Sequence, residues 1–146
     1  MTPDFLFQIA NPLAMAGWAV LILAPRRWAV LGHLPRTAVP LLLAALYSAL
    51  VLAHFFTAEG GYDSLANVAL LFQTPEVLLA GWVHYLAFDL MIGALMADRM
   101  DRAGVVRVLQ APVLVTIFLF GPMGVLLALA TEGAVRLLPA RSEALA

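Results

Sequence analysis

The sequence predicts an all-α integral membrane protein, a four-helix bundle formed by one domain over residues 1–146. Hydrophobic residues make up 64% of the chain and charged residues only 12%, and a water-soluble protein of this length could not bury so much apolar surface. The apolar residues form four runs, at about 5–24, 38–56, 75–97 and 111–130. A helix needs about 20 residues to cross the hydrocarbon core and satisfies its own backbone there, so we expect four spans.

The arginines predict the direction of these spans. All eight basic residues are arginine: Arg26, Arg27 and Arg36 between the first two spans, Arg99, Arg102 and Arg107 between the last two, and Arg136 and Arg141 after the fourth. Because cytoplasmic loops carry an excess of basic residues, we expect both loops to be cytoplasmic and both termini to lie on the outer, non-cytoplasmic side. The 57–74 connection has acidic but no basic residues, which fits the outer side.

The first span is expected to be retained, because no basic residue precedes it and its apolar run is longer than a signal-peptide core. No organelle transit segment is evident, so a bacterial inner (plasma) membrane is the expected location. The formal net charge of −1 gives no reason to expect a nucleic-acid partner. The chain has no cysteine, which excludes disulfides and thiolate metal sites.

The start of the third span follows from local sequence. In Thr74-Pro75-Glu76, Thr can cap a helix, Pro suits its first position, and Glu favours its positive end. The mostly apolar segment 64–72 before it is expected to lie in the membrane interface or against the bundle.

A kink is expected near the middle of the fourth span, at Gly121-Pro122. Pro122 cannot donate a hydrogen bond to the carbonyl of Phe118, which leaves that acceptor free.

Polar residues at membrane depth are the most informative feature of the chain. Asp89 lies about halfway along the third span, where a charged Asp costs about 2.5–3.5 kcal/mol, so desolvation favours the neutral acid. Tyr85 and Trp82 precede it by four and seven residues and share its helix face. His84 points about 140° away from Asp89, given 3.6 residues per turn.

Under this topology, further polar residues fall in the outer half of the first three spans, whereas the inner halves are almost wholly apolar: Gln8, Asn11, His54, Glu76 and His84. This asymmetry predicts a polar cavity that opens toward the outer leaflet, with Asp89 at its floor. Asp89 and His84 are the candidate catalytic residues, because intramembrane ionisable groups are a functional hypothesis by default. The other polar residues, with Trp82 and Tyr85, are candidate ligand-binding residues, although packing, interfacial and helix-dipole roles are the plainer interpretation for several of them.

Metal ligation is a weaker interpretation of the same residues. His54 and His84 lie on adjacent spans at similar depth, so bis-His ligation of a haem stays open, and zinc would also need Glu76. No His-x-x-His or Glu-x-x-His spacing supports either site. We therefore assign no metal site, and the cofactor is unknown.

Three blocks of sequence carry a family resemblance: Ala10-Asn11 with Gly17-Trp18 and Ala24-Pro25-Arg26, then the stretch 81–90, then the stretch 120–124. In this order they resemble the abscisic-acid-deficient-four-like family over about residues 5–130. The Trp-x-His-x-x-x-x-Asp pattern from Trp82 to Asp89 is the most specific of the three.

The resemblance implies a small four-helix membrane protein linked to carotenoids. In plants the linked step converts violaxanthin to neoxanthin, an epoxide opening that yields an allene. It implies a carotenoid or other isoprenoid lipid as ligand, next to membrane lipids. An isomerase mechanism would use Asp89 as the acid and His84 as the base, with Glu76 or His54 relaying protons. Many bacteria make no violaxanthin, so the substrate stays open.

A role without chemistry also stays open: a pigment-, haem- or quinone-binding subunit, or an assembly factor. Gly93 and Ala97, four residues apart, allow close helix approach within this chain, to a second copy or to another membrane protein. A transporter or channel is disfavoured, because the sequence shows no repeat and no polar line through the inner half.

Overall fold

The computed structural model describes residues 2–25 and 28–137, and every regular element in these ranges is helical, as predicted. Three helical stretches are long and apolar enough to cross a membrane: α1 (Pro3–Leu23), the run Leu31–Thr57 and α5 (Pro75–Arg102). They correspond to the first three predicted spans. The chain is a membrane protein by this criterion.

The second of these stretches is not one regular helix. It begins within α2 (Ala29–His33), passes through the π-helical turn η1 (Leu34–Ala38), continues as α3 (Val39–His54) and ends in the 3-10 turn η2 (Phe55–Thr57). Proline at the start of η1 and again at the start of α3 removes backbone donors there, which accounts for the irregular turn.

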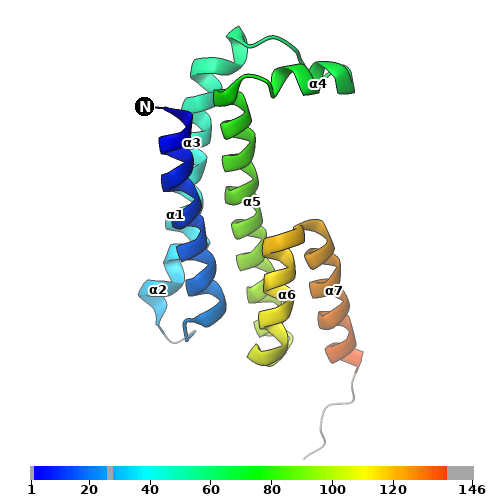
Figure 1. Ribbon diagram of the computed structural model, residues 1–146. Coiled ribbons are helices and arrows are strands. Elements are labelled where there is room, and N and C mark those ends of the chain that lie inside the picture. The colour runs from blue at the N-terminus through cyan, green and yellow to red at the C-terminus, as the bar shows by residue number, and fades with distance from the viewer. Residues whose placement is uncertain (1, 26–27, 138–146) are drawn as a thin grey trace, which may run out of the picture.

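The predicted fourth span at 111–130 is wrong. The chain rises as α6 (Arg107–Phe120), reverses at Gly121 and returns as α7 (Pro122–Leu137), so the two helices lie side by side as a hairpin (Figure 1). Gly121 adopts φ 39° and ψ −100°, a conformation that L side chains avoid. Gly124 lets the arms approach, because a Cβ there would collide with the backbone of Ile117. The predicted kink is a complete reversal.

This hairpin also changes the predicted position of the C-terminal part. The start of α1 and the end of α7 lie at opposite ends of the bundle, so the described residues do not confirm the expectation that both termini share one side (Figure 1). We call the end where α1 begins the acidic end, after Asp4, Glu59, Asp63 and Glu76.

The opposite end gathers the described arginines, and we call it the arginine end: Arg36, Arg99, Arg102, Arg107 and Arg136. Arg36 Nε lies 3.1 Å from Oδ1 of Asp98, and Arg107 Nη2 donates to the carbonyl of Ile22 at 2.7 Å. These bonds tie η1 to α5 and α6 to α1. The predicted direction of the spans also used three arginines that lie outside the described residues: Arg26, Arg27 and Arg141.

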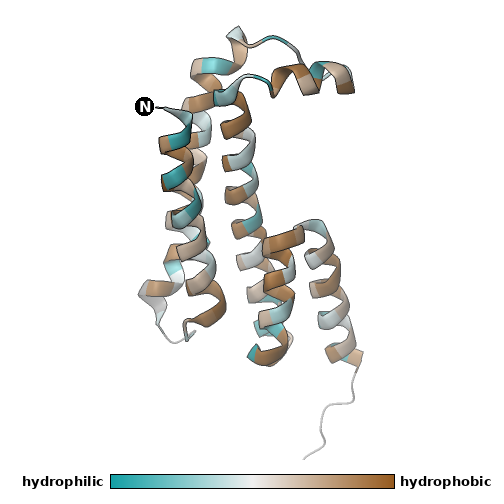
Figure 2. Ribbon diagram, in the orientation of Figure 1, coloured by the Kyte–Doolittle hydropathy of each residue, from teal (hydrophilic) through white to brown (hydrophobic). Residues whose placement is uncertain are grey.

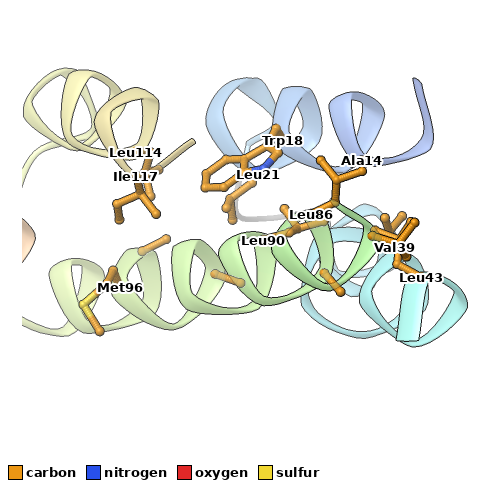
Figure 3. Packing of buried hydrophobic residues seen from close by; sticks show 14 of the residues in the cluster. Ala14, Trp18, Leu21, Val39, Leu43, Leu86, Leu90, Met96, Leu114 and Ile117 are labelled. Carbon is orange, nitrogen blue, oxygen red and sulfur yellow. The ribbon is translucent and has the colours of Figure 1, made fainter. Parts of the chain in front are cut away.

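The core surrounds α5, which buries one side against α1 and α3 and its C-terminal half against the hairpin. Trp18 and Leu21 of α1 lie over Leu90 of α5, while Leu114 and Ile117 of α6 pack toward the C-terminal part of α5 (Figure 3). Gly93 makes this possible, because a Cβ there would collide with the Trp18 indole. The Gly93–Ala97 pair therefore serves packing within the chain.

A short helix, α4 (Leu65–Leu71), crosses the acidic end next to the start of α5 (Figure 1). The Ser64 hydroxyl caps it by accepting from the Asn67 amide at 3.1 Å. The Asn67 side chain donates to Asp63 at 2.9 Å, and this hydrogen bond lowers the pKa of the Asp63 carboxyl. Phe72, just after α4, packs on Gly81 of α5, so this end of the segment lies against the bundle. Leu65, at the start of α4, is exposed.

Candidate functional site

The predicted site residues divide between two faces of α5. Trp82, Tyr85 and Asp89 face α1 and the tip of the hairpin, whereas His84 faces α3. The helical spacing that places Trp82, Tyr85 and Asp89 on one face is therefore confirmed, and so is the different direction of His84.

The first face forms an aromatic groove between α1 and α5. The Trp82 indole Nε1 donates to Oδ1 of Asn11 at 2.8 Å and so joins the two helices. The Trp82 ring centroid lies 5.5 Å from that of Tyr85 and 6.0 Å from that of Phe7. Trp82 and Tyr85 remain 41% and 36% exposed, so their rings are open to a ligand.

A cavity of about 280 Å³ lies at the acidic end of this face, lined by Pro3, Asp4, Phe7, Pro75, Leu78, Leu79 and Trp82. Tyr85 and Asp89 lie beyond this cavity on the same face of α5. We call the cavity together with this face, as far as Asp89, the Trp82 groove. The hydrophilic residues of α1 gather in its N-terminal half, beside the groove, and its C-terminal half is more hydrophobic (Figure 2). The part of the groove toward the acidic end thus combines one exposed hydrogen bond with several aromatic side chains.

The hairpin tip forms the floor of the Trp82 groove. The Tyr85 hydroxyl donates to the Phe118 carbonyl at 3.3 Å, which is the acceptor that Pro122 leaves free. Gly121 lies directly against Asp89, since a Cβ on Gly121 would stand 3.2 Å from Asp89 Oδ1. The freed carbonyl expected from the sequence is confirmed, and Tyr85 is its partner.

Asp89 is the unsatisfied group of the groove. Its Oδ2 atom is buried and has no partner within hydrogen-bond geometry among the described residues. The Tyr85 hydroxyl interacts with this carboxyl group, but its hydrogen bond goes to the Phe118 carbonyl. A buried carboxyl oxygen without a donor is costly, whereas a protonated carboxyl offers a hydrogen-bond donor of its own. The arrangement presents one acid against the hairpin tip, on the same face of α5 as Trp82 and Tyr85.

His84 belongs to a second cavity, of about 230 Å³, between α3 and α5. Its ring stacks on Phe88 at 4.5 Å between centroids and lies 5.2 Å from the ring of Tyr47. The other aromatic residues of this cavity are Phe55, Tyr62 and Phe72. His84 and Asp89 therefore do not meet in one cavity, and the structure does not bring the predicted acid and base together.

The remaining candidates lie apart from the groove or at its edge. Gln8 is exposed on α1, while Asn11, one turn later, is bound to Trp82. His54 lines a separate cavity of about 250 Å³ with the loop residues Thr57 and Glu59. Glu76 is half-buried in the first turn of α5. Over residues 2–25 and 28–137, no three His, Asp or Glu side chains gather as a metal site would require.

The sequence interpretation missed Phe7, Phe118 and Gly121 as parts of the groove. Phe7 carried no polar signal, and an aromatic residue near a helix start is common. Gly121 did carry a signal, because glycine followed by proline marks a turn. Its contact with Asp89 depends on the reversal, which brings a residue 32 positions later against the acid.

Comparison with known proteins agrees with the resemblance in the sequence. The family model described as ABA DEFICIENT 4-like matches residues 5–127. No curated protein and no solved structure matches the chain. The matched range includes nearly all of α1, the whole of α3, α5 and α6, and the hairpin tip, and thus all of the Trp82 groove except Pro3 and Asp4. The chain belongs to the ABA DEFICIENT 4-like family, and it is a carotenoid-related membrane protein.

Proposed function

We propose that this protein binds an oxygenated end ring of a carotenoid in the Trp82 groove and isomerises an epoxide on that ring, with Asp89 as the catalytic residue. The observation that carries the proposal is the buried Asp89 Oδ2 without a donor at the floor of an aromatic groove. When Oδ2 carries the proton, a substrate oxygen at this position would accept its hydrogen bond. Family membership supports the carotenoid class, because this is a carotenoid-related family.

The groove suits such a ring for physical reasons. A methylated ring is apolar and matches the faces of Trp82, Tyr85 and Phe7. The single oxygen of an epoxide needs one donor, which a protonated Asp89 supplies. The polyene needs no polar partner, so it stays in the hydrocarbon beside α1 and α5. Desolvation strengthens the contact between the acid and the oxygen.

One carboxyl group can act as both the acid and the base of this isomerisation. Asp89 donates its proton to the epoxide oxygen as the carbon–oxygen bond breaks and its electron pair passes to oxygen. The Asp89 carboxylate then removes a proton from the neighbouring chain carbon, and the electrons of that carbon–hydrogen bond form the new double bond. Asp89 ends protonated, and the product is an isomer of the substrate. This route needs no second base, which agrees with the position of His84 on another face.

A pigment comparison tests the proposal. A host that accumulates an epoxide carotenoid would carry the wild-type protein, Asp89→Asn or the control Asp63→Asn, which makes the same exchange in the exposed loop. Extracts would be separated by chromatography with mass detection. We expect an isomer of unchanged mass with the wild type and with Asp63→Asn, and none with Asp89→Asn. Equal conversion by all three proteins would contradict a catalytic Asp89.

A non-catalytic pigment-binding subunit is the second candidate. It is favoured by one observation: Asp89 is the one carboxyl group among the three side chains Trp82, Tyr85 and Asp89, and the side chains around it are mainly aromatic. Purified protein that retains a carotenoid at fixed stoichiometry, with the pigment chemically unchanged, would support binding alone. An epoxide-carotenoid pool that stays unchanged in cells carrying the well-expressed protein would exclude conversion.

We further propose that the arginine end faces the cytoplasm, in a bacterial inner membrane. Five described arginines at one end support this direction by the positive-inside rule. The Trp82 groove would then open in the outer half of the bilayer, where ring oxygens lie near the polar interface.

A further inference from the structure

A second polar cluster lies at the arginine end, where α5 meets α7. Glu132 forms ion pairs with two arginines: Arg99 Nε lies 2.9 Å from its Oε2, and Arg136 Nη2 lies 2.6 Å from its Oε1. The Glu132 side chain is only 5% exposed, whereas both arginines reach the surface. One buried carboxylate thus fixes the direction of two guanidinium groups.

The cluster has more positive than negative charge. A cavity of about 250 Å³ is lined by Leu95, Arg99, Arg102, Glu132 and Arg136. Three guanidinium groups against one carboxylate leave two positive charges facing the cavity. We call it the arginine pocket.

The nearby acids on α5 have partners of their own. Asp98 pairs with Arg36, whose Nε lies 3.1 Å from Oδ1, and Asp101 accepts a hydrogen bond from Gln110 at 2.7 Å. Neither residue lines the arginine pocket. Among residues 2–25 and 28–137, Glu132 is the one carboxylate that lines the arginine pocket, so the positive charge of the pocket favours binding of an anion.

We propose that the arginine pocket binds the phosphate group of an anionic phospholipid. Guanidinium groups bind phosphate oxygens through paired N–H donors, and Arg99 and Arg136 keep donors beyond those that Glu132 uses. Basic pockets between helices at the end of a membrane span are suited to lipid headgroups. Leu95 lines the same pocket and is exposed, so it offers an acyl chain a contact that a soluble phosphate could not use.

A lipid in this pocket would also act on the Trp82 groove. It would connect α5 to α7, the second arm of the hairpin. The tip of this hairpin, at Gly121, lies against Asp89 in the groove. The site itself does not depend on the proposed isomerisation, so it is tested by lipid binding alone.

Lipid retention by native mass spectrometry tests the site. The protein would be released from nanodiscs that contain phosphatidylglycerol and phosphatidylcholine in equal amounts. The main variant is Arg102→Gln, because Arg102 lines the pocket but makes neither ion pair with Glu132. We expect it to retain about fivefold less phosphatidylglycerol than the wild type, as for the loss of one basic residue at a lipid headgroup.

The matched control is Arg36→Gln, which removes the same charge from the same end but belongs to the Asp98 pair. It should retain phosphatidylglycerol like the wild type. A second variant, Arg136→Lys, keeps the charge and loses the paired donors, so it should also retain less. Thermal unfolding in phosphatidylcholine alone would check that each variant is folded.

Three results would overturn the proposal. One is equal retention of the two lipids by the wild type, and another is an equal loss in Arg102→Gln and Arg36→Gln. The third uses inorganic pyrophosphate as competitor: if it displaced phosphatidylglycerol completely at low millimolar concentration, the pocket would be a site for soluble phosphate compounds. Selective loss in Arg102→Gln, with retention resistant to pyrophosphate, would support the lipid site.

Discussion

Asp89 on α5 lies against Gly121, the residue at which the chain reverses between α6 and α7. A methyl group added to Gly121 would stand 3.2 Å from Asp89 Oδ1. The acid at membrane depth and the tip of the hairpin are therefore in contact. The turn between α6 and α7 therefore forms part of the surroundings of the acid.

Replacement of Gly121 by alanine should destabilise the hairpin tip. Gly121 has φ 39°, and a non-glycine residue held in such a conformation costs about 1–3 kcal/mol. The added methyl group also approaches Asp89 Oδ1. We expect a lower thermal unfolding temperature in detergent and weaker pigment conversion.

Gly133→Ala is the matched control for that exchange. Gly133 is helical in α7, and a Cβ there meets no atom within 4 Å. Alanine is favoured over glycine in a helix by about 1 kcal/mol, so this variant should be as stable as the wild type or more stable. Equal destabilisation by the two variants would contradict the special role of Gly121.

The Trp82–Asn11 hydrogen bond should appear as a coupling energy between α5 and α1. In a double-mutant cycle with Trp82→Phe and Asn11→Ala, we expect a coupling of about 0.5–1.5 kcal/mol in the free energy of unfolding. The reason is the 2.8 Å bond from the indole Nε1 to Asn11 Oδ1. Unfolding by denaturing detergent would measure it. The same cycle with the exposed Gln8→Ala should give no coupling, and a coupling of similar size there would contradict the assignment.

The sequence was sufficient for the three spanning stretches because their signals are local. Apolar length predicted a span at 75–97, and Thr74-Pro75-Glu76 predicted where it starts; α5 begins at Pro75 and extends to Arg102. Helical spacing alone placed Trp82 and Asp89 on one face and His84 on another. These features depend on neighbouring residues, so one sequence is enough to infer them.

The hairpin could not be inferred in the same way. Both of its arms are apolar, since they lie among other apolar helices, and together they are as long as one span. The Gly121-Pro122 signal predicts a break, but the angle of the break depends on tertiary contacts, such as the Tyr85 hydroxyl on the Phe118 carbonyl. Reading the two arms as one span also set Arg136 on the opposite side from Arg99. In the structure both arginines pair with Glu132.

His84→Phe should leave pigment conversion nearly unchanged. His84 stacks on Phe88 and faces Tyr47 in the cavity toward α3, so phenylalanine preserves the ring contacts. We expect conversion within about twofold of the wild type, as for a residue outside the reacting groups, whereas Asp89→Asn abolishes it. Chromatography of the same pigment extracts would measure both variants. Complete loss of conversion in a well-expressed His84→Phe protein would instead restore His84 as the base.

Single cysteines should reveal the reversal of the chain at Gly121. The protein has no cysteine, so each substitution creates one labelling site. Glu59 lies at the acidic end and Leu137 at the end of α7, and both side chains are exposed. With the arginine end in the cytoplasm, a membrane-impermeant maleimide should label Glu59→Cys in intact cells and Leu137→Cys only after permeabilisation. Asp4→Cys, at the start of α1, is the matched control and should behave like Glu59→Cys. Labelling of Leu137→Cys together with Asp4→Cys in intact cells would mean that the last segment crosses the membrane as one span, and the floor beneath Asp89 would then be lost.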